Sequence, residues 1–489
     1  MKSKKLVILL FTLVLSIGLF PMSVLAASTS LAEDSTASVT VQNAVKDDEL
    51  AAYKVIDITY NASTNHLTYA WNSDFANYFT DTTVEAFAAL ESDSDALKNK
   101  LAGLPAYIAT NSISSVDTKI VGADKTAVFS NLAMGEYFIR PTSSTSVYQL
   151  MLQKVEPTVE NHSYVLNDVT FAAKHKEVSI TKTADKTSVT KGEKVNYTVT
   201  VDIPSYSAEA TNKAFSITDK LSEGLTLDTS SINVKIASTD VDTTAYTLAT
   251  NASDYAFKLS VDTDKYTANW SANGGKQLVI TYSATLNDDN TTEVNTPETN
   301  TAEYEYSYYP YEDNSTKKKT AEADVNTFAI KIDKYDAGEE STKLKNAKFD
   351  LYRTATQAEI NAGSTVTIPH TTVSGIKLES DVVTDENGSA TFAKYQANGT
   401  NYDYYLVETQ APHGYNILEN AVKVNFTDSD VSSTNGVYTV KVSNNSGFIL
   451  PITGGKGVAL FTVIGIAFMG CAVFLFIISR KKAKANDKK

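Results

Sequence analysis

The segment VNYTVTVDIP, residues 195–204, alternates apolar and polar side chains and ends at a proline. The apolar residues at every second position are Val195, Tyr197, Val199, Val201 and Ile203. This spacing of two places them on one face of a β-strand, with polar side chains on the other. Proline has no N–H for a central ladder, so the strand ends at Pro204. The segment therefore predicts a half-buried strand of a β-sheet.

The same alternation recurs along most of the chain, for example at Tyr438, Val440 and Val442. Together with 27 tyrosines it favours antiparallel β-sandwiches, of which 489 residues require more than one. We expect a mainly β protein with tandem Ig-like or Cna-type sandwiches. The exception is residues 82–111, where apolar residues recur at helical spacing and predict two short helices packed on the first sandwich.

The two ends of the chain carry a predicted export signal and a predicted membrane anchor. Lysines 2, 4 and 5 precede an apolar stretch and a small-residue site, which predicts a signal peptide over 1–26 that is cut after Ala26. Residues 457–478 are apolar and long enough, at roughly 33 Å as a helix, to cross a bilayer. The basic tail 479–489 keeps the end of the chain in the cytoplasm. We expect everything between these segments to lie outside the cell.

Charge and composition exclude several function classes. The net charge is −14, and it becomes about −23 without the signal peptide and the residues after Thr453, so the exported part does not suit nucleic acid. The single cysteine, Cys471, lies in the apolar run, so no disulfide can staple the exported domains. The five histidines show no metal-ligand spacing, and there is no Gly-x-Ser-x-Gly elbow. We therefore expect no metal, no cofactor and no hydrolase activity.

The pentapeptide Leu450-Pro451-Ile452-Thr453-Gly454 stands directly before the apolar run and the basic tail. In this order the segment 450–455 resembles the LPxTG sorting signal of sortase substrates. The resemblance implies that a membrane sortase cuts between Thr453 and Gly454, holds the threonine carbonyl as a thioester and passes it to an amine. The chain would be a substrate in that reaction, and peptidoglycan its final attachment.

Three polar residues continue apolar strand faces near the C-terminus. Lys334 follows Phe328, Ile330 and Ile332 at the strand spacing, Glu408 follows Tyr404 and Leu406, and Asn444 follows Tyr438, Val440 and Val442. A buried lysine, acid and carboxamide are the reagents for an isopeptide bond, because burial favours the neutral amine and the protonated acid. The acid could polarise the amide and pass a proton to the departing ammonia.

The residues around Glu408 match a known motif. Tyr404-Tyr405-Leu406-Val407-Glu408-Thr409, followed by Ala411-Pro412-His413-Gly414-Tyr415, resembles the E-box of CnaB-type pilin domains. In that family the E-box glutamate promotes a bond from a lysine on the first strand to an asparagine on the last. The resemblance assigns these positions to Lys334 and Asn444.

A second set of inward polar residues lies in the middle of the chain. Lys182, Asp219 and Asn300 each share an apolar strand face. The segment Ile217–Leu221 with Gly224–Thr226 resembles the acid-bearing segment of the second domain of major pilins, where aspartate often replaces glutamate. The resemblance implies a Lys182–Asn300 bond, with Lys186 and Asn295 as alternative partners.

Polymerisation into a pilus requires an acceptor amine. Val165, Val169, Phe171 and Lys174 fit the spacing of the family's pilin-lysine pattern, with departures at the tryptophan, the second valine and the Tyr-Pro pair. We predict Lys174 as the acceptor, with Lys176 as the alternative. Some relatives place an asparagine for a further bond directly after this lysine, and here His175 takes that position.

The expected domains are an N-terminal pilin domain over 27–174, a middle sandwich over 175–326 and a CnaB-type sandwich over 327–449. The chain is thus similar to the major pilins of Gram-positive bacteria, which implies a wall-anchored surface pilus of identical subunits, sortases as partners and accessory pilins. The competing interpretation is a singly anchored adhesin or accessory pilin that binds a host ligand through its first domain.

Overall fold

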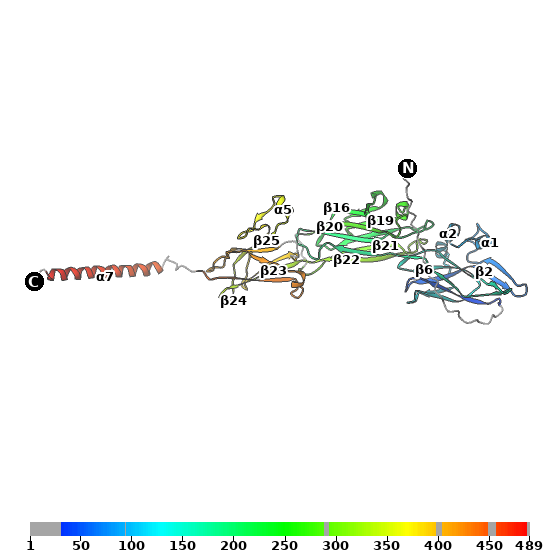
Figure 1. Ribbon diagram of the computed structural model, residues 1–489, viewed down its shortest axis with the longest axis horizontal. Helices are drawn as coiled ribbons and strands as arrows, with labels where there is room; N and C mark the ends of the chain where they lie inside the picture. The colour runs from blue at the N-terminus through cyan, green and yellow to red at the C-terminus, as the bar shows by residue number, and fades with distance from the viewer. Residues whose placement is uncertain (1–30, 93, 288–292, 398–402, 448–455, 487–489) are drawn as a thin grey trace, which may run out of the picture. The chain divides into compact units, whose positions relative to one another are not determined.

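The structure is a computed structural model that describes residues 31–92, 94–287, 293–397, 403–447 and 456–486. Strands dominate it, which confirms the mainly β prediction (Figure 1). The chain forms two compact units. The first holds the described residues up to Glu177 together with Ser207–Asn212 and Tyr308–Ser315, and the second holds the rest. The predicted signal peptide with Ala26, and the sorting segment 450–455, lie outside the described residues.

The N-terminal part contains two main sheets. One has the order β11-β1-β5, and the other has the order β3-β2-β6-β8 with β4 also paired to β2. The strands are β1 (Thr36–Gln42), β2 (Glu49–Asn61), β3 (His66–Trp71), β4 (Asp117–Ile120), β5 (Ala127–Ala133), β6 (Gly135–Ser143), β8 (Met151–Val155) and β11 (Val169–Ala172). Two short pairs are added: β7 (Ser146–Tyr148) with β12 (His175–Glu177), and β9 (Thr158–Glu160) with β10 (Ser163–Val165).

Three helices, not the two expected, occupy the helical insertion. They are α1 (Val84–Ala88), α2 (Asp95–Leu101) and α3 (Leu104–Thr110). The predicted second helix is divided because α2 is capped at Ala102, and the next helix starts from Gly103 with a proline in its first turn. Proline is favoured in a first turn and disrupts a helix interior, so two helices form where the apolar spacing suggested one.

The middle sandwich has two five-stranded sheets. Their orders are β13-β14-β20-β16-β17 and β18-β19-β15-β21-β22. The strands are β13 (Ile180–Ala184), β14 (Lys194–Asp202), β15 (Phe215–Leu221), β16 (Leu225–Ile236), β17 (Thr239–Asp240), β18 (Thr247–Thr250), β19 (Phe257–Val261), β20 (Gln277–Leu286), β21 (Glu298–Ser307) and β22 (Thr316–Val325), with the short helices η1 (Thr243–Ala245) and α4 (Ala268–Ser271). The predicted strand 195–203 is β14, whose valines and Tyr197 are fully buried.

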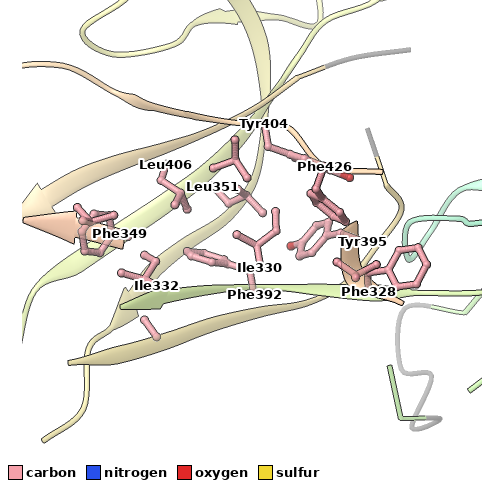
Figure 2. Close-up of a cluster of buried hydrophobic side chains, with 14 of the residues drawn as sticks. Phe328, Ile330, Ile332, Phe349, Leu351, Phe392, Tyr395, Tyr404, Leu406 and Phe426 are labelled. Atoms are coloured by element: carbon pink, nitrogen blue, oxygen red, sulfur yellow. The ribbon is translucent and has the colours of Figure 1, made fainter. Parts of the chain in front are cut away.

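The C-terminal sandwich pairs a β24-β23-β28 sheet, to which β31 is added in parallel beside β23, with a β26-β27-β25-β29-β30 sheet. Its elements are β23 (Phe328–Asp336), β24 (Glu339–Lys343), β25 (Lys348–Thr354), α5 (Gln357–Asn361), β26 (Val366–Thr367), β27 (Ser374–Val383), β28 (Ser389–Tyr395), β29 (Tyr404–Gln410), β30 (Val422–Val424), α6 (Asp428–Val431) and β31 (Val437–Asn444). Figure 2 shows the core between the sheets, where Ile330, Ile332 and Phe392 face Leu351 and Leu406.

The last described element is α7 (Lys456–Asn486), a helix with one apolar window, Thr462–Arg480, long enough to cross a membrane. The window overlaps the predicted span 457–478. Its mean hydropathy of 2.5 and the absence of buried residues within this window fit a segment that a bilayer, not a protein core, would cover.

Candidate functional site

The C-terminal sandwich brings Lys334, Glu408 and Asn444 together. Lys334 lies near the end of β23 and Asn444 ends the neighbouring parallel strand β31, while Glu408 comes from β29 in the opposite sheet. The three residues are 0%, 2% and 1% exposed. The strand faces that predicted them do continue into the core. The apolar side chains before Lys334 and Glu408 are buried on the same face, and before Asn444, Val442 is buried while Tyr438 and Val440 are half-buried against the core.

The backbone of Lys334 is held by two hydrogen bonds. Its N–H donates to the Gly388 carbonyl at 2.8 Å, and its carbonyl accepts from Leu344 N–H at 2.9 Å. Gly388 has φ +68°, and a Cβ there would stand 2.3 Å from the Lys334 carbonyl oxygen. Only glycine allows the turn before β28 to approach this closely, so the turn fixes the lysine at its position.

The side chains of the trio are arranged in a chain from amine to amide to acid. Lys334 Nζ donates to Asn444 Oδ1 and, at 3.3 Å, to the Val442 carbonyl. Asn444 Nδ2 donates to both carboxyl oxygens of Glu408, at 3.0 and 2.9 Å. The amine therefore stands beside the carboxamide, and the acid stands beside the nitrogen that would leave.

The loop after the E-box completes this site. Leu418 N–H donates to Glu408 Oε2 at 2.8 Å, and the Asn416 carbonyl accepts from Asn444 Nδ2 at 2.8 Å. These two bonds orient the acid and the amide from the same short segment. Sequence reasoning identified the acid and the amide but not these backbone partners, which no side-chain pattern reveals.

Burial changes the charge states of the trio. Desolvation lowers the pKa of Lys334 to about 8, although Glu408 opposes this shift, and desolvation raises the pKa of Glu408. A lysine with a pKa of about 8 is neutral in roughly a tenth of molecules at pH 7, against less than about a thousandth for an ordinary lysine. The site therefore supplies a nucleophilic amine and an acid able to hold a proton.

The middle sandwich brings Lys182, Asp219 and Asn300 together in the same way. They lie on β13, β15 and β21, with the lysine on one sheet and the acid and amide on the other. Lys182 Nζ donates to Asn300 Oδ1 at 2.5 Å and also to Asp219 Oδ2. Desolvation lowers the pKa of Lys182 to about 8 and raises the pKa of Asp219. The alternative partners Lys186 and Asn295 are half-buried and take no part in this cluster.

Two tyrosines complete the middle cluster and were not predicted. Tyr282 OH accepts from Lys182 Nζ at 2.7 Å, and Tyr197 stacks on Tyr282 with ring centroids 5.6 Å apart. Both lie at inward positions of the neighbouring strands β20 and β14, in which apolar and polar residues alternate. In the sequence such tyrosines resemble ordinary core residues, so only the fold reveals that they surround a lysine.

Lys174 is exposed and lies between β11 and β12. Its carbonyl accepts from Gln149 N–H at 2.9 Å, and it lines a groove of about 390 Å³ together with Leu97, Leu101 and Tyr311. Lys176 is also exposed but lies within β12, opposite Val147. His175 stacks on Tyr148, with ring centroids 5.2 Å apart. The two lysines thus differ in that Lys174 borders a groove of the first unit.

Two family models match the two C-terminal sandwiches. Residues 191–310 match the Gram-positive pilin backbone subunit 2, Cna-B-like domain, and residues 328–445 match SpaA, a prealbumin-like fold domain. The first match covers Asp219 and Asn300 of the middle trio, and the second covers the whole C-terminal trio of Lys334, Glu408 and Asn444.

Known proteins with related sequences include a fimbrial subunit and a surface protein. The chain is 26% identical to a fimbrial subunit type 1 of Actinomyces viscosus, over 61% of this chain and 63% of that protein. It thus spans under two thirds of the length of that relative. It is 24% identical to the trypsin-resistant surface T6 protein of Streptococcus pyogenes, over 67% of this chain and 73% of that protein.

Solved structures share the fold. The T6 backbone pilin of serotype M6 Streptococcus pyogenes aligns with a TM-score of 0.60 and 20% identity, covering 81% of each chain. The full-length major pilin SpaD of Corynebacterium diphtheriae aligns with a TM-score of 0.56 and 18% identity, covering 86% of this chain and 99% of that one. At these identities the likeness is one of fold.

Proposed function

This chain is a member of the backbone pilins of Gram-positive bacteria, and on that premise we propose that it is the shaft subunit of a covalent surface pilus. A sortase joins Thr453 of one subunit to Lys174 of the next, and the finished polymer is attached to peptidoglycan. Accessory pilins are further partners, and the pilus supports adhesion and colonisation. The chain itself is a sortase substrate and not an enzyme acting on other molecules.

The polymer bond follows from amide chemistry. The sortase cysteine displaces Gly454 from the Thr453 carbonyl and holds that carbonyl as a thioester. The neutral Lys174 amine attacks the carbonyl, an amide bond forms and the cysteine leaves as the thiol. The exposed position of Lys174 beside a groove supports its role, because an acceptor must reach a carbonyl that another protein holds.

Two intramolecular bonds stabilise the shaft in this proposal. The Lys334 amine attacks the side-chain carbon of Asn444, the bond from that carbon to Nδ2 breaks, and ammonia leaves. Glu408 accepts the proton from the amine and gives one to the departing nitrogen, which its oxygens contact at 3.0 and 2.9 Å. Lys182 and Asn300 react in the same sense in the middle sandwich, with Asp219 as the acid. The proposed catalytic acids are thus Glu408 and Asp219.

The observation that carries the proposal is the buried trio of Lys334, Glu408 and Asn444. An uncompensated lysine in a protein core is costly, and a structure that only needed a filled core would use an apolar residue there. Asn444 also stands a few residues before the sorting motif. A covalent bond at that position ties the segment that bears the polymer load to the first strand of its domain.

The experiment is a denaturing immunoblot of wall extracts from cells that express the wild-type chain, Lys174→Ala or Lys176→Ala. The expected result is a ladder of polymers for wild type and Lys176→Ala, and its loss for Lys174→Ala. A ladder lost only in Lys176→Ala moves the acceptor to that residue. A single band in all three rejects the shaft and supports the singly anchored adhesin.

A further inference from the structure

The two trios differ in how the acid reaches the amide. In the C-terminal sandwich the Glu408 carboxyl contacts Asn444 Nδ2 directly. In the middle sandwich, within the part of the chain that the structure describes, no hydrogen bond joins Asp219 to Asn300, although the two residues lie on neighbouring strands. Aspartate is one methylene shorter than glutamate, and the hydrogen bonds that the Asp219 carboxyl makes in this cluster go to Lys182 and Tyr282. The middle site needs another group to carry the proton across.

The Tyr282 hydroxyl occupies the position between the acid and the amide. It donates to Asp219 Oδ2 at 2.6 Å, accepts from Asn300 Nδ2 at 2.9 Å, and accepts from Lys182 Nζ at 2.7 Å. The residue is 3% exposed, so within this cluster the hydroxyl is enclosed by the three reacting groups. Burial raises the pKa of Tyr282, which keeps the hydroxyl protonated and able to donate.

We propose that Tyr282 is a catalytic residue of the middle isopeptide bond, acting as the proton relay between Asp219 and the nitrogen that leaves Asn300. This inference rests on the proposed function, since it presumes that Lys182 and Asn300 react. The C-terminal site needs no such relay, because its longer acid, Glu408, contacts the leaving nitrogen directly.

The proposed reaction conserves every atom and proton. The neutral Lys182 amine attacks the side-chain carbon of Asn300 and passes a proton to Asp219. The Tyr282 hydroxyl gives its proton to Nδ2 and takes one from Asp219, the carbon–nitrogen bond breaks, and ammonia leaves. Tyrosine and aspartate end in their starting forms, and the new bond joins Lys182 Nζ to the carbonyl carbon of Asn300. No oxidant or further reactant is required.

Tyr197 provides a matched control. It stacks on Tyr282, its ring lies 5.6 Å from Lys182 Nζ, and the ring of Tyr282 lies 5.4 Å from the same nitrogen. Its buried hydroxyl, however, has no hydrogen-bond partner among the described residues. Tyr197→Phe and Tyr282→Phe therefore remove the same atom from the same cluster, and only the second interrupts the proposed relay.

The test is to follow the Lys182–Asn300 bond during refolding of the denatured, unlinked full chain, or in pulse-labelled cells, by mass spectrometry of the cross-linked peptide. Loss of general acid–base assistance slows such a step by about 10² or more. We expect Tyr282→Phe to slow bond formation by about this factor and Tyr197→Phe to leave it unchanged. The Lys334–Asn444 bond in the same molecules should form at the wild-type rate in both variants.

Stability measurements separate a structural effect of the substitutions from a catalytic one. In an Asn300→Ala background, where no bond can form, the melting temperatures of the two phenylalanine variants measure the structural cost of losing each hydroxyl, which is greater for Tyr282 because its hydroxyl is bonded to Lys182 and Asp219. If Tyr282→Phe then forms the bond as fast as Tyr197→Phe, the relay is overturned. If the wild-type chain never forms a Lys182–Asn300 bond, the proposed crosslink itself fails, a result that the mass of the wild-type peptide shows before any variant is made.

Discussion

Replacing Glu408 by glutamine should remove the C-terminal crosslink while keeping the size of the side chain. The bond would close a loop between Lys334 and Asn444, which are 110 residues apart. If it restricts the unfolded chain as a disulfide does, a loop of that length stabilises the domain by about 5 kcal/mol at 25 °C. The matched domain spans residues 328–445, and a domain of that size loses about 20 °C in melting temperature for such a change.

The assay is calorimetry with intact mass measured on the same samples. Wild type should lack one ammonia per bond, and Glu408→Gln should regain one ammonia and lower the transition of the C-terminal domain by about 20 °C. The control is Glu340→Gln, which removes an exposed carboxylate bonded to Lys441 on the same strand as Asn444, and should change neither mass deficit nor melting measurably.

One result would refute the reasoning about stability. Suppose that Glu408→Gln lacks the bond by mass and still melts within a few degrees of wild type. The crosslink then does not stabilise the domain by restricting the conformations of the unfolded chain. If instead its mass shows the bond intact, Glu408 is not required as the acid.

Three further outcomes are expected. Because burial lowers the pKa of Lys334 to about 8, the rate of its bond formation in refolding samples should rise with pH up to about 8, and a rate independent of pH below that value would argue against a neutral amine nucleophile. Burial raises the pKa of Glu136 to about 7 from 4.5, so the folded chain retains a proton that the unfolded chain has lost. Stability of the first unit should therefore fall between about pH 4.5 and 7, and urea titrations of Glu136→Gln should show this fall removed. Glu312→Ala leaves Arg140, 2.8 Å from that carboxylate and mostly buried, without its partner, and hydrogen exchange of residues 308–315 should report a loss of roughly 3 kcal/mol; unchanged exchange would show the pair to be dispensable.

The strand period explains how much of the trios could be predicted. Lys334 and Glu408 each follow buried apolar residues at a spacing of two. If the strand continues in the sheet for two more residues, the next residue on the same face must also be buried. The residue types then indicated the chemistry. Periodicity could not pair the strands, so it did not show that Lys334 and Asn444 lie on neighbouring strands of one sheet whereas Lys182 and Asn300 lie on opposite sheets.

Other features were hidden because their residues look ordinary. Tyr282 occupies an inward position between Ile280 and Ala284, where a tyrosine usually fills space, and its role depends on which hydroxyl partners the fold supplies. The segment Tyr308–Ser315 joins two strands of the middle sandwich yet belongs to the first compact unit. Its long-range contacts, such as Tyr308 OH to the Thr142 carbonyl at 2.9 Å, have no signature in local sequence.

The positions of the proposed bonds follow from what a pulled polymer requires. Tension on a subunit would enter at Lys174 and leave at Thr453. With both bonds formed, the shortest covalent path runs from Lys174 to Lys182, crosses to Asn300, continues to Lys334 and crosses to Asn444. The segments between the bonded residues, 118 and 110 residues apart, lie outside this path.

Those bypassed segments contain most of the buried apolar residues of the two sandwiches, including all of β25 and β29 in the C-terminal one. The strands in these segments could then retain their hydrogen bonds under load, because the force would not pass along them. The same reasoning predicts where the chain yields first when a bond is missing: in Glu408→Gln, β31 would peel from β23, to which it is joined by the parallel pairing of Ala329–Asp336 with Val437–Asn444. Single-molecule pulling between residues 174 and 447 should therefore extend Glu408→Gln by the contour of about 110 residues more than wild type, and equal extensions would place the load elsewhere.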